Sequence, residues 1–166
     1  MYYQTDPRAP EDFRAYACLF SCLLYAREVL RGLPWTIGEA IQAWSVCRGK
    51  GYISGDLNGD GDYDDAGEDE IQKYQGIFDE LNLPLRYVPP ESLGLPMSNA
   101  GRILPVTEAL DPSRWWVVEA WRWKYVHFVK GYGHGIKPVQ YDPIEGGSHS
   151  VRYGRCESLR VFEVIV

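Results

Sequence analysis

The sequence predicts an α+β protein in which N-terminal helices pack on a C-terminal antiparallel β-sheet. In the first half, apolar residues recur at steps of three and four, which is the period of an amphipathic helix. In the second half, runs rich in Trp, Val, Tyr and Phe are separated by turn residues, a pattern that is typical of β-strands. Because helices come first and strands later, the order favours α+β over alternating α/β. A length of 166 residues suits one domain, so we expect a single domain over residues 1–166.

The helical half begins with a predicted helix over residues 15–31, which Gly32 should end. Thr36 followed by Glu39 forms a capping-box pattern, in which each residue satisfies a backbone N–H of the other. A second helix should therefore begin there, and it should end near residues 49–51.

A third helix is expected over residues 71–81, before the chain turns to extended segments. Residues 115–121 and 125–132 flank a short polar turn, so they predict an antiparallel hairpin. Residues 89–105 hold four prolines and predict a loop. The other predicted strands cover residues 83–88, 139–141 and 159–166.

Composition excludes several classes of protein. Hydrophobic residues make up 45% and charged residues 24%, which is ordinary for a globular domain. No apolar run reaches the roughly 18 residues of a membrane span, and no signal peptide is visible. No cluster of Lys and Arg could follow a phosphate backbone, so nucleic acid is not an expected partner. Four cysteines are too few for a disulfide framework, and together with the missing signal these unpaired cysteines favour the cytoplasm.

An acidic segment lies between the second and third predicted helices. Residues 56–70 carry eight of the 23 acidic residues and no Lys or Arg. Calcium prefers six to eight oxygen ligands, and alternate positions of a loop can direct side chains to one point. We therefore interpret residues 52–70 as an insertion that holds one structural Ca²⁺. The expected ligands are Asp56, Asn58, Asp60, Asp62 through its carbonyl oxygen, and Glu68.

The pattern of this segment resembles EF-hand-like calcium loops of the DxNxDG type. The bidentate acid of such loops stands at the twelfth position, which is Gly67 here, so Glu68 fits with one extra residue. A solvated acidic turn is the alternative interpretation. We favour the cation because eight uncompensated carboxylates repel one another. Calcium is abundant outside cells, so an extracellular location also stays open.

Three residues with catalytic potential are spread along the chain. Cys18 lies early in the first helix, His127 lies within a strand, and Asp142 follows a later strand. Each has an ordinary explanation by itself: a core thiol, a sheet histidine and the cap of an Asp-Pro turn. A helix N-terminus and a neighbouring imidazole both stabilise a thiolate, and a carboxylate orients that imidazole.

In this order the residues resemble the papain-like cysteine peptidases, in particular the bacteriocin-processing, double-glycine-leader branch. The matching segments are YYQTDPR with Gln4, ACLFSCLLYA with Cys18, HFVKGYG with His127, and YDPIEGG with Asp142. The resemblance implies a papain-like fold and a thiol hydrolase that cleaves a peptide or amide bond. It implies that Cys18 attacks the carbonyl carbon while His127 takes and returns the proton. Asp142 would hold the imidazole, and Gln4 would stabilise the oxyanion with the Cys18 backbone N–H.

Several alternatives stay open. Cys22 lies one turn after Cys18 and could be the nucleophile instead. Residues 11–17 could be helical, which would place Cys18 inside a longer helix without the N-terminal dipole. We interpret His134 and His149 as surface loop residues. The expected substrate is a peptide or peptide-like molecule, and the competing classes are a catalytically silent papain-like domain that binds a peptide or protein partner, and a calcium-binding structural module.

Overall fold

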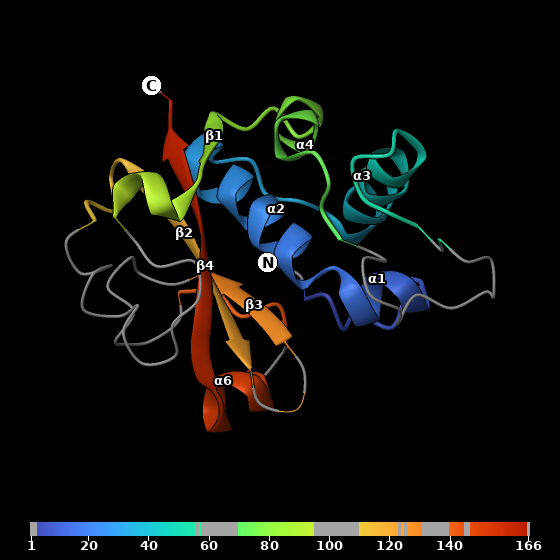
Figure 1. Ribbon diagram of the computed structural model, residues 1–166. Coiled ribbons are helices and arrows are strands. Elements are labelled where there is room, and N and C mark those ends of the chain that lie inside the picture. Colours follow the sequence, from blue (N-terminus) through green and yellow to red (C-terminus); the bar gives the residue numbers. More distant parts are fainter. Residues whose placement is uncertain are drawn as a thin grey trace. The chain divides into compact units, whose positions relative to one another are not determined.

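The chain forms two compact units in a computed structural model, Met1–Leu83 and Pro84–Val166 (Figure 1). The structure describes residues 3–55, 57, 70–94, 110–122, 124, 126–130, 140–144 and 147–165. Within these ranges, the first unit is helical and the second carries a four-stranded antiparallel sheet. The α+β class is therefore confirmed.

The first unit is held together by an aromatic group that joins three of its helices. The helices are α1 (Glu11–Tyr16), α2 (Cys18–Arg31), α3 (Ile37–Gly49) and α4 (Tyr74–Glu80). Trp44 of α3 makes edge contacts with Phe13 of α1 and Phe20 of α2, with ring centroids 5.7 and 5.3 Å apart. All three rings are buried, and edge-to-face pairs are favourable beyond the area they bury. None of the helices in the described part of the chain is long and apolar enough to cross a bilayer.

The prediction of one helix over residues 15–31 is wrong at its N-terminal end. Two helices occupy this part of the chain, and Ala17 lies between them outside either helix. Ala17 has φ −79° and ψ 20°, and its N–H donates to the Phe13 carbonyl, which ends α1. The predicted end at Gly32 is confirmed, because Gly32 adopts a left-handed conformation with φ 66°.

The predicted capping box at the start of α3 is confirmed. The Glu39 N–H donates to Thr36 Oγ1 at 3.2 Å, and the Thr36 N–H donates to Glu39 Oε2 at 2.9 Å. The third helix is shorter than predicted, because Ile71 forms an antiparallel bridge with Ile53 and α4 begins only at Tyr74. This bridge joins the two ends of the acidic segment.

The second unit is organised around a sheet whose strand order is β1-β4-β2-β3, with every neighbouring pair antiparallel. The predicted hairpin is confirmed by β2 and β3, which pair from Val118 opposite Lys130 to Arg122 opposite Val126. The elements are β1 (Leu85–Val88), the 3₁₀ helix η1 (Pro90–Leu93), β2 (Trp115–Arg122), β3 (Val126–Lys130), α6 (His149–Tyr153) and β4 (Arg155–Val164).

The pairing of β2 with β4 forms the centre of this sheet. Val117 of β2 packs with Leu159 and Val161 of β4, and all three are fully buried. The register shifts between Ala120 and Trp121, which marks a β-bulge. Strand β4 begins at Arg155, before the predicted start at residue 159, because its pairing with β2 continues beyond the bulge. The apolar residues of this first stretch do not alternate, so the sequence pattern did not indicate a strand there.

Candidate active site

Cys18 is the first residue of α2. The N–H groups in the first turn of a helix have no intrahelical acceptor, and they stabilise an anion placed beside them. Because α1 is a separate helix, Cys18 does not lie inside a longer one. Its side chain is largely buried, with 8% of the residue exposed, and Sγ lies 3.9 Å from the Tyr16 carbonyl oxygen. The local backbone thus places this thiol at a helix N-terminus.

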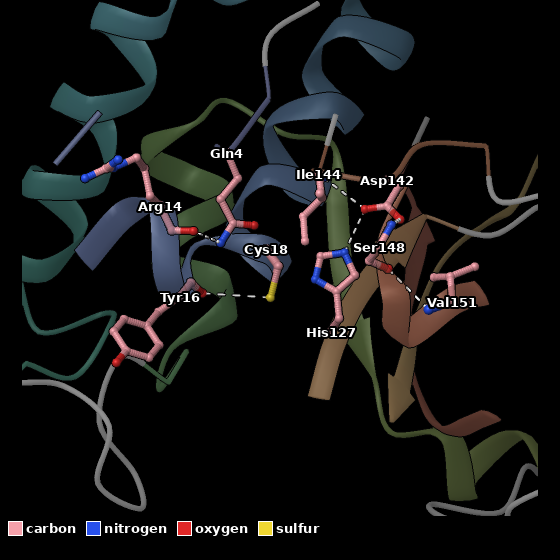
Figure 2. Close-up of polar contacts among 9 residues, drawn as sticks. All are labelled: Gln4, Arg14, Tyr16, Cys18, His127, Asp142, Ile144, Ser148 and Val151. Atoms are coloured by element: carbon pink, nitrogen blue, oxygen red, sulfur yellow. Dashed lines mark hydrogen bonds and ion pairs between the residues drawn. The ribbon is translucent and has the colours of Figure 1, made fainter. Parts of the chain in front are cut away.

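Gln4 reaches the junction between α1 and α2 from the N-terminal segment (Figure 2). Only 2% of the residue is exposed, and its Nε2 donates to the Arg14 carbonyl oxygen at 2.8 Å. The contact fixes the orientation of the amide, because the opposite orientation would place Oε1 against another acceptor. Arg14 lies four residues before Cys18, which is one helical turn. The first unit therefore brings the predicted oxyanion donor to the start of the predicted nucleophile's helix.

The other cysteines are less suited to act as nucleophiles. Cys22 is fully buried and lies beyond the first turn of α2. Burial raises the pKa of Cys47 to about 12, and burial together with the nearby Glu119 charge raises the pKa of Cys156 to about 12. Such thiols stay protonated at neutral pH and react slowly. All four cysteines are free of disulfides, and Cys18 is the best placed of them.

His127 and Asp142 form a buried hydrogen-bonded pair in the second unit. His127 lies in β3, and its Nε2 is 2.7 Å from Asp142 Oδ1 (Figure 2). The side chains are 4% and 8% exposed. Asp142 reaches this position because Tyr141 forms an antiparallel bridge with Lys130, the last residue of β3. The residue before Asp142 is therefore tied to the strand that carries the histidine.

The carboxylate of Asp142 is held by two backbone donors as well. The Ile144 N–H donates to Oδ1 at 2.9 Å, and the Ser148 N–H donates to Oδ2 at 2.8 Å. Burial by itself would raise the pKa of Asp142, but the His127 interaction and the two backbone hydrogen bonds outweigh it and lower the pKa. An ionised carboxylate only accepts hydrogen bonds, so Nε2 is the ring nitrogen of His127 that carries the proton.

Ser148 is a supporting residue that the sequence analysis missed. It is the N-cap of α6, and its Oγ accepts from the Val151 N–H at 3.2 Å. Its own N–H binds Asp142, so one residue starts the helix and anchors the carboxylate. A Ser before a short polar segment is a recognisable N-cap signal, but nothing in the sequence links it to Asp142. The interpretation of His149 as a loop residue is wrong, because it begins α6, although it is exposed as expected.

The predicted calcium ligands lie outside the described residues, and so does His134. These ligands are Asp56, Asn58, Asp60, Asp62 and Glu68. In the part of the chain that the structure describes, no group of three or more His, Cys, Asp and Glu residues could hold a metal ion. The described ends of the segment are joined, because the Ser54 N–H donates to the Glu70 carbonyl at 3.0 Å and the Glu70 N–H donates to Ser54 Oγ at 2.9 Å.

The candidate residues thus form two pairs, a thiol with an amide donor in the first unit and an imidazole with a carboxylate in the second. Chemically, the first pair supplies a nucleophile and a hydrogen-bond donor, and the second supplies a base whose orientation is fixed. Comparison with known proteins adds no relative: no family model matches the chain, and no curated protein or solved structure is significantly similar to it.

Proposed function

We propose that the protein is a papain-like thiol hydrolase that cleaves a peptide or amide bond. The observation that carries this proposal is the buried His127–Asp142 hydrogen bond of 2.7 Å, with both carboxylate oxygens also held by backbone N–H groups. A histidine that only filled space in a sheet would not need so fully oriented a partner. The free Cys18 at the first position of α2 supplies the matching nucleophile.

The proposed reaction proceeds in two steps. His127 takes the proton of the Cys18 thiol at Nδ1, and the sulfur attacks the carbonyl carbon of the substrate to form a tetrahedral oxyanion. The oxyanion collapses to a thioester as His127 returns the proton to the leaving amine. Water, deprotonated by His127, then attacks the thioester and releases the acid and the free thiol.

The other two residues have supporting roles in this mechanism. Asp142 accepts from Nε2–H throughout, so the imidazole keeps Nδ1 as its basic nitrogen and its positive charge is stabilised when it forms. Gln4 and the Cys18 backbone N–H would donate to the oxyanion. The Gln4 amide has two N–H groups, and the Arg14 carbonyl uses one of them.

We also propose that residues 52–70 bind one Ca²⁺ and stabilise the fold without taking part in the chemistry. Two observations support a closed loop: the Ile53–Ile71 bridge and the hydrogen bonds between Ser54 and Glu70. A loop whose ends are already joined loses less conformational entropy when its ligands come together around a cation. The ligands would be those predicted from the DxNxDG pattern.

A second candidate is a catalytically silent papain-like domain that binds a peptide. The near-complete burial of Gln4, together with its bond to Arg14, favours this alternative, because an oxyanion donor must be able to reach the substrate. Thiol reactivity separates the two candidates. An enzyme needs one fast thiol, whereas a silent domain has no use for one.

The test is alkylation by iodoacetamide at pH 7, followed residue by residue by mass spectrometry. We expect Cys18 to react at least about tenfold faster than the other three thiols, because only it lies at a helix N-terminus. Cys18→Ala should keep the melting temperature of the wild type and abolish both the fast phase and any hydrolysis of a fluorogenic peptide. Cys22→Ala should keep both the fast alkylation phase and the hydrolysis of the peptide. Four slow thiols would establish the silent domain.

The same assay tests the proposed base. His127→Ala should shift the pH dependence of Cys18 alkylation to higher pH, because the imidazolium that stabilises the thiolate is removed. His149→Ala is the matched control, since His149 is exposed on α6. An unchanged profile in His127→Ala would show that the two residues are not partners.

A further inference from the structure

The break between α1 and α2 has no local cause. From Glu11 to Arg31 only Ala17 lies outside a helix, and alanine has the highest helix propensity of all residues. No Gly, Pro or β-branched residue stands between residues 11 and 28. Local preference would therefore join the two helices into one, so a contact from elsewhere in the chain must interrupt the backbone hydrogen bonds.

Gln4 makes a contact of this kind at the junction. In a continuous helix the Cys18 N–H would donate to the Arg14 carbonyl, four residues earlier. That carbonyl instead accepts from Gln4 Nε2 at 2.8 Å. The Gln4 side chain is almost fully buried, and the segment that carries it is folded by backbone bonds from Asp6 N–H to the Tyr3 carbonyl and from Ala9 N–H to the Asp6 carbonyl. The amide is thus held in place ten residues away in sequence from the carbonyl it binds.

We propose that Gln4 is a positioning residue that separates α1 from α2 and so keeps Cys18 at a helix N-terminus. By occupying the Arg14 carbonyl, it leaves the N–H groups of the first turn of α2 available to stabilise the Cys18 thiolate. This role differs from donation to an oxyanion, because it acts on the resting thiol before any substrate binds. It rests on the proposed function only in taking Cys18 as the reactive thiol.

The two roles of Gln4 can be separated by the choice of reagent. In alkylation by iodoacetamide, the sulfur displaces iodide from a saturated carbon; a C–S bond forms, iodide leaves with the bonding electrons, and the thiol proton goes to solvent. No carbonyl oxyanion is formed. A residue that acted only as an oxyanion donor would therefore leave this reaction unchanged, whereas a residue that keeps the thiolate at a helix terminus would alter it.

The decisive variant is Gln4→Met, which keeps the length of the side chain and removes the donor. We expect Cys18 in this variant to be alkylated about two- to fivefold more slowly at pH 7, the range that the loss of a typical helix-terminus interaction gives. The pH profile of alkylation should shift upward accordingly. Gln4→Glu should behave in the same way, because its carboxylate cannot donate to the Arg14 carbonyl. Gln42→Met, at an exposed position of α3, is the control and should react like the wild type.

Amide hydrogen exchange provides a second measurement that does not depend on a variant. In the wild type, the Cys18 N–H should exchange much faster than the Cys22 N–H, which lies within the same helix. In Gln4→Met, the Cys18 N–H should become protected as it pairs with Arg14. Equal protection of the two amides in the wild type would overturn the proposal even if Gln4→Met did not fold. If the Cys18 thiol is alkylated fast in the wild type and equally fast in Gln4→Met, the positioning role is refuted and the proposed function stands. If the wild-type Cys18 thiol is alkylated as slowly as the other three thiols, the proposed function is refuted.

Discussion

The pKa of Asp142 is set by two opposing effects, burial and hydrogen bonding, and the result can be tested by measuring stability against pH. Burial opposes ionisation of Asp142, while His127 and the backbone N–H groups of Ile144 and Ser148 favour it, and together they lower its pKa. Glu119 shows the opposite balance: burial raises its pKa, and the hydrogen bond from Trp121 Nε1 does not compensate. These two buried carboxyls should therefore respond to pH with opposite signs.

We predict that Asp142→Asn destabilises the protein by about 1–3 kcal/mol at pH 7, the cost of losing a buried hydrogen bond to a charged group. Because the folded pKa of Asp142 is below its unfolded value, ionised Asp142 contributes stability above about pH 4. That contribution is lost as the pH falls through the folded pKa. The difference in unfolding free energy between wild type and variant should therefore shrink in acid, which urea titrations at several pH values would measure.

Glu119→Gln is the matched variant with the opposite expectation. The folded pKa of Glu119 is above its unfolded value, so its contribution to stability is lost as the pH rises through the folded pKa. Gln keeps an acceptor for Trp121 and carries no charge. The variant should therefore be more stable than the wild type at pH 7 and equal to it below about pH 4. A pH-independent difference for either variant would contradict these opposite pKa shifts.

The candidate residues could be predicted from the sequence one by one, but the contacts that orient their side chains could not. Cys18, His127 and Asp142 were predicted because thiol, imidazole and carboxylate follow one another in a familiar order. The contacts that orient them, from Gln4 to Arg14 and from Ser148 to Asp142, join residues through the folded backbone. Backbone carbonyls and N–H groups look the same at every position of a sequence, so no pattern indicates which of them a side chain will bind.

At the scale of elements, α6 connects the sheet to the candidate site. Its N-cap, Ser148, binds Asp142, and its C-cap, Gly154, leads directly into β4. A Cβ atom at Gly154 would lie 2.3 Å from the carbonyl oxygens of Arg122 and Ser150. Both are backbone atoms, so they cannot swing aside as a flexible side chain would. The close approach of α6 to the end of β2 thus requires glycine.

We predict that Gly154→Ala destabilises the protein by about 2–3 kcal/mol, because overpacking against backbone forces β2 and α6 apart. Under the proposed mechanism it should also slow Cys18 alkylation, because a displaced Ser148 disturbs the Asp142–His127 pair. Thermal denaturation and the iodoacetamide assay would measure the two effects. Gly49→Ala is the control, since a Cβ there meets nothing within 4 Å and the residue is already helical. Equal stability of the two variants would contradict the close approach.

Long, periodic elements followed from the sequence, whereas short elements and non-local pairings did not. The capping box and the β2–β3 hairpin depend on residues close together in the chain, so their patterns are readable. Helix α6 is five residues long, which is too short to show a helical period. The first four residues of β4 are strand only because they pair with β2, and the bulge there breaks the alternation that would reveal them.

At the scale of the whole molecule, charge is concentrated in one place. Of the net charge of −6, the segment 56–70 alone contributes eight acidic residues without a base. Its described ends are joined by the Ile53–Ile71 bridge. Eight acidic residues so close together in the sequence repel one another, which destabilises the folded state unless a cation binds. The acidic segment should therefore make the stability of the protein depend on calcium.

We predict that chelation with EDTA lowers the melting temperature of the calcium-loaded protein by several degrees. A ligand that binds only the folded state stabilises it by about 2.7 kcal/mol at a hundredfold excess over Kd, and proteins of about this size shift by roughly 2–4 °C per kcal/mol. Asp60→Ala should remove the calcium dependence, because it deletes a predicted ligand. Glu70→Gln, which removes a charge from the same segment but no predicted ligand, should keep it. If EDTA left the melting curve unmoved, the segment would be a solvated acidic turn; if Glu70→Gln abolished the effect as fully as Asp60→Ala, net charge and not a defined site would bind the cation.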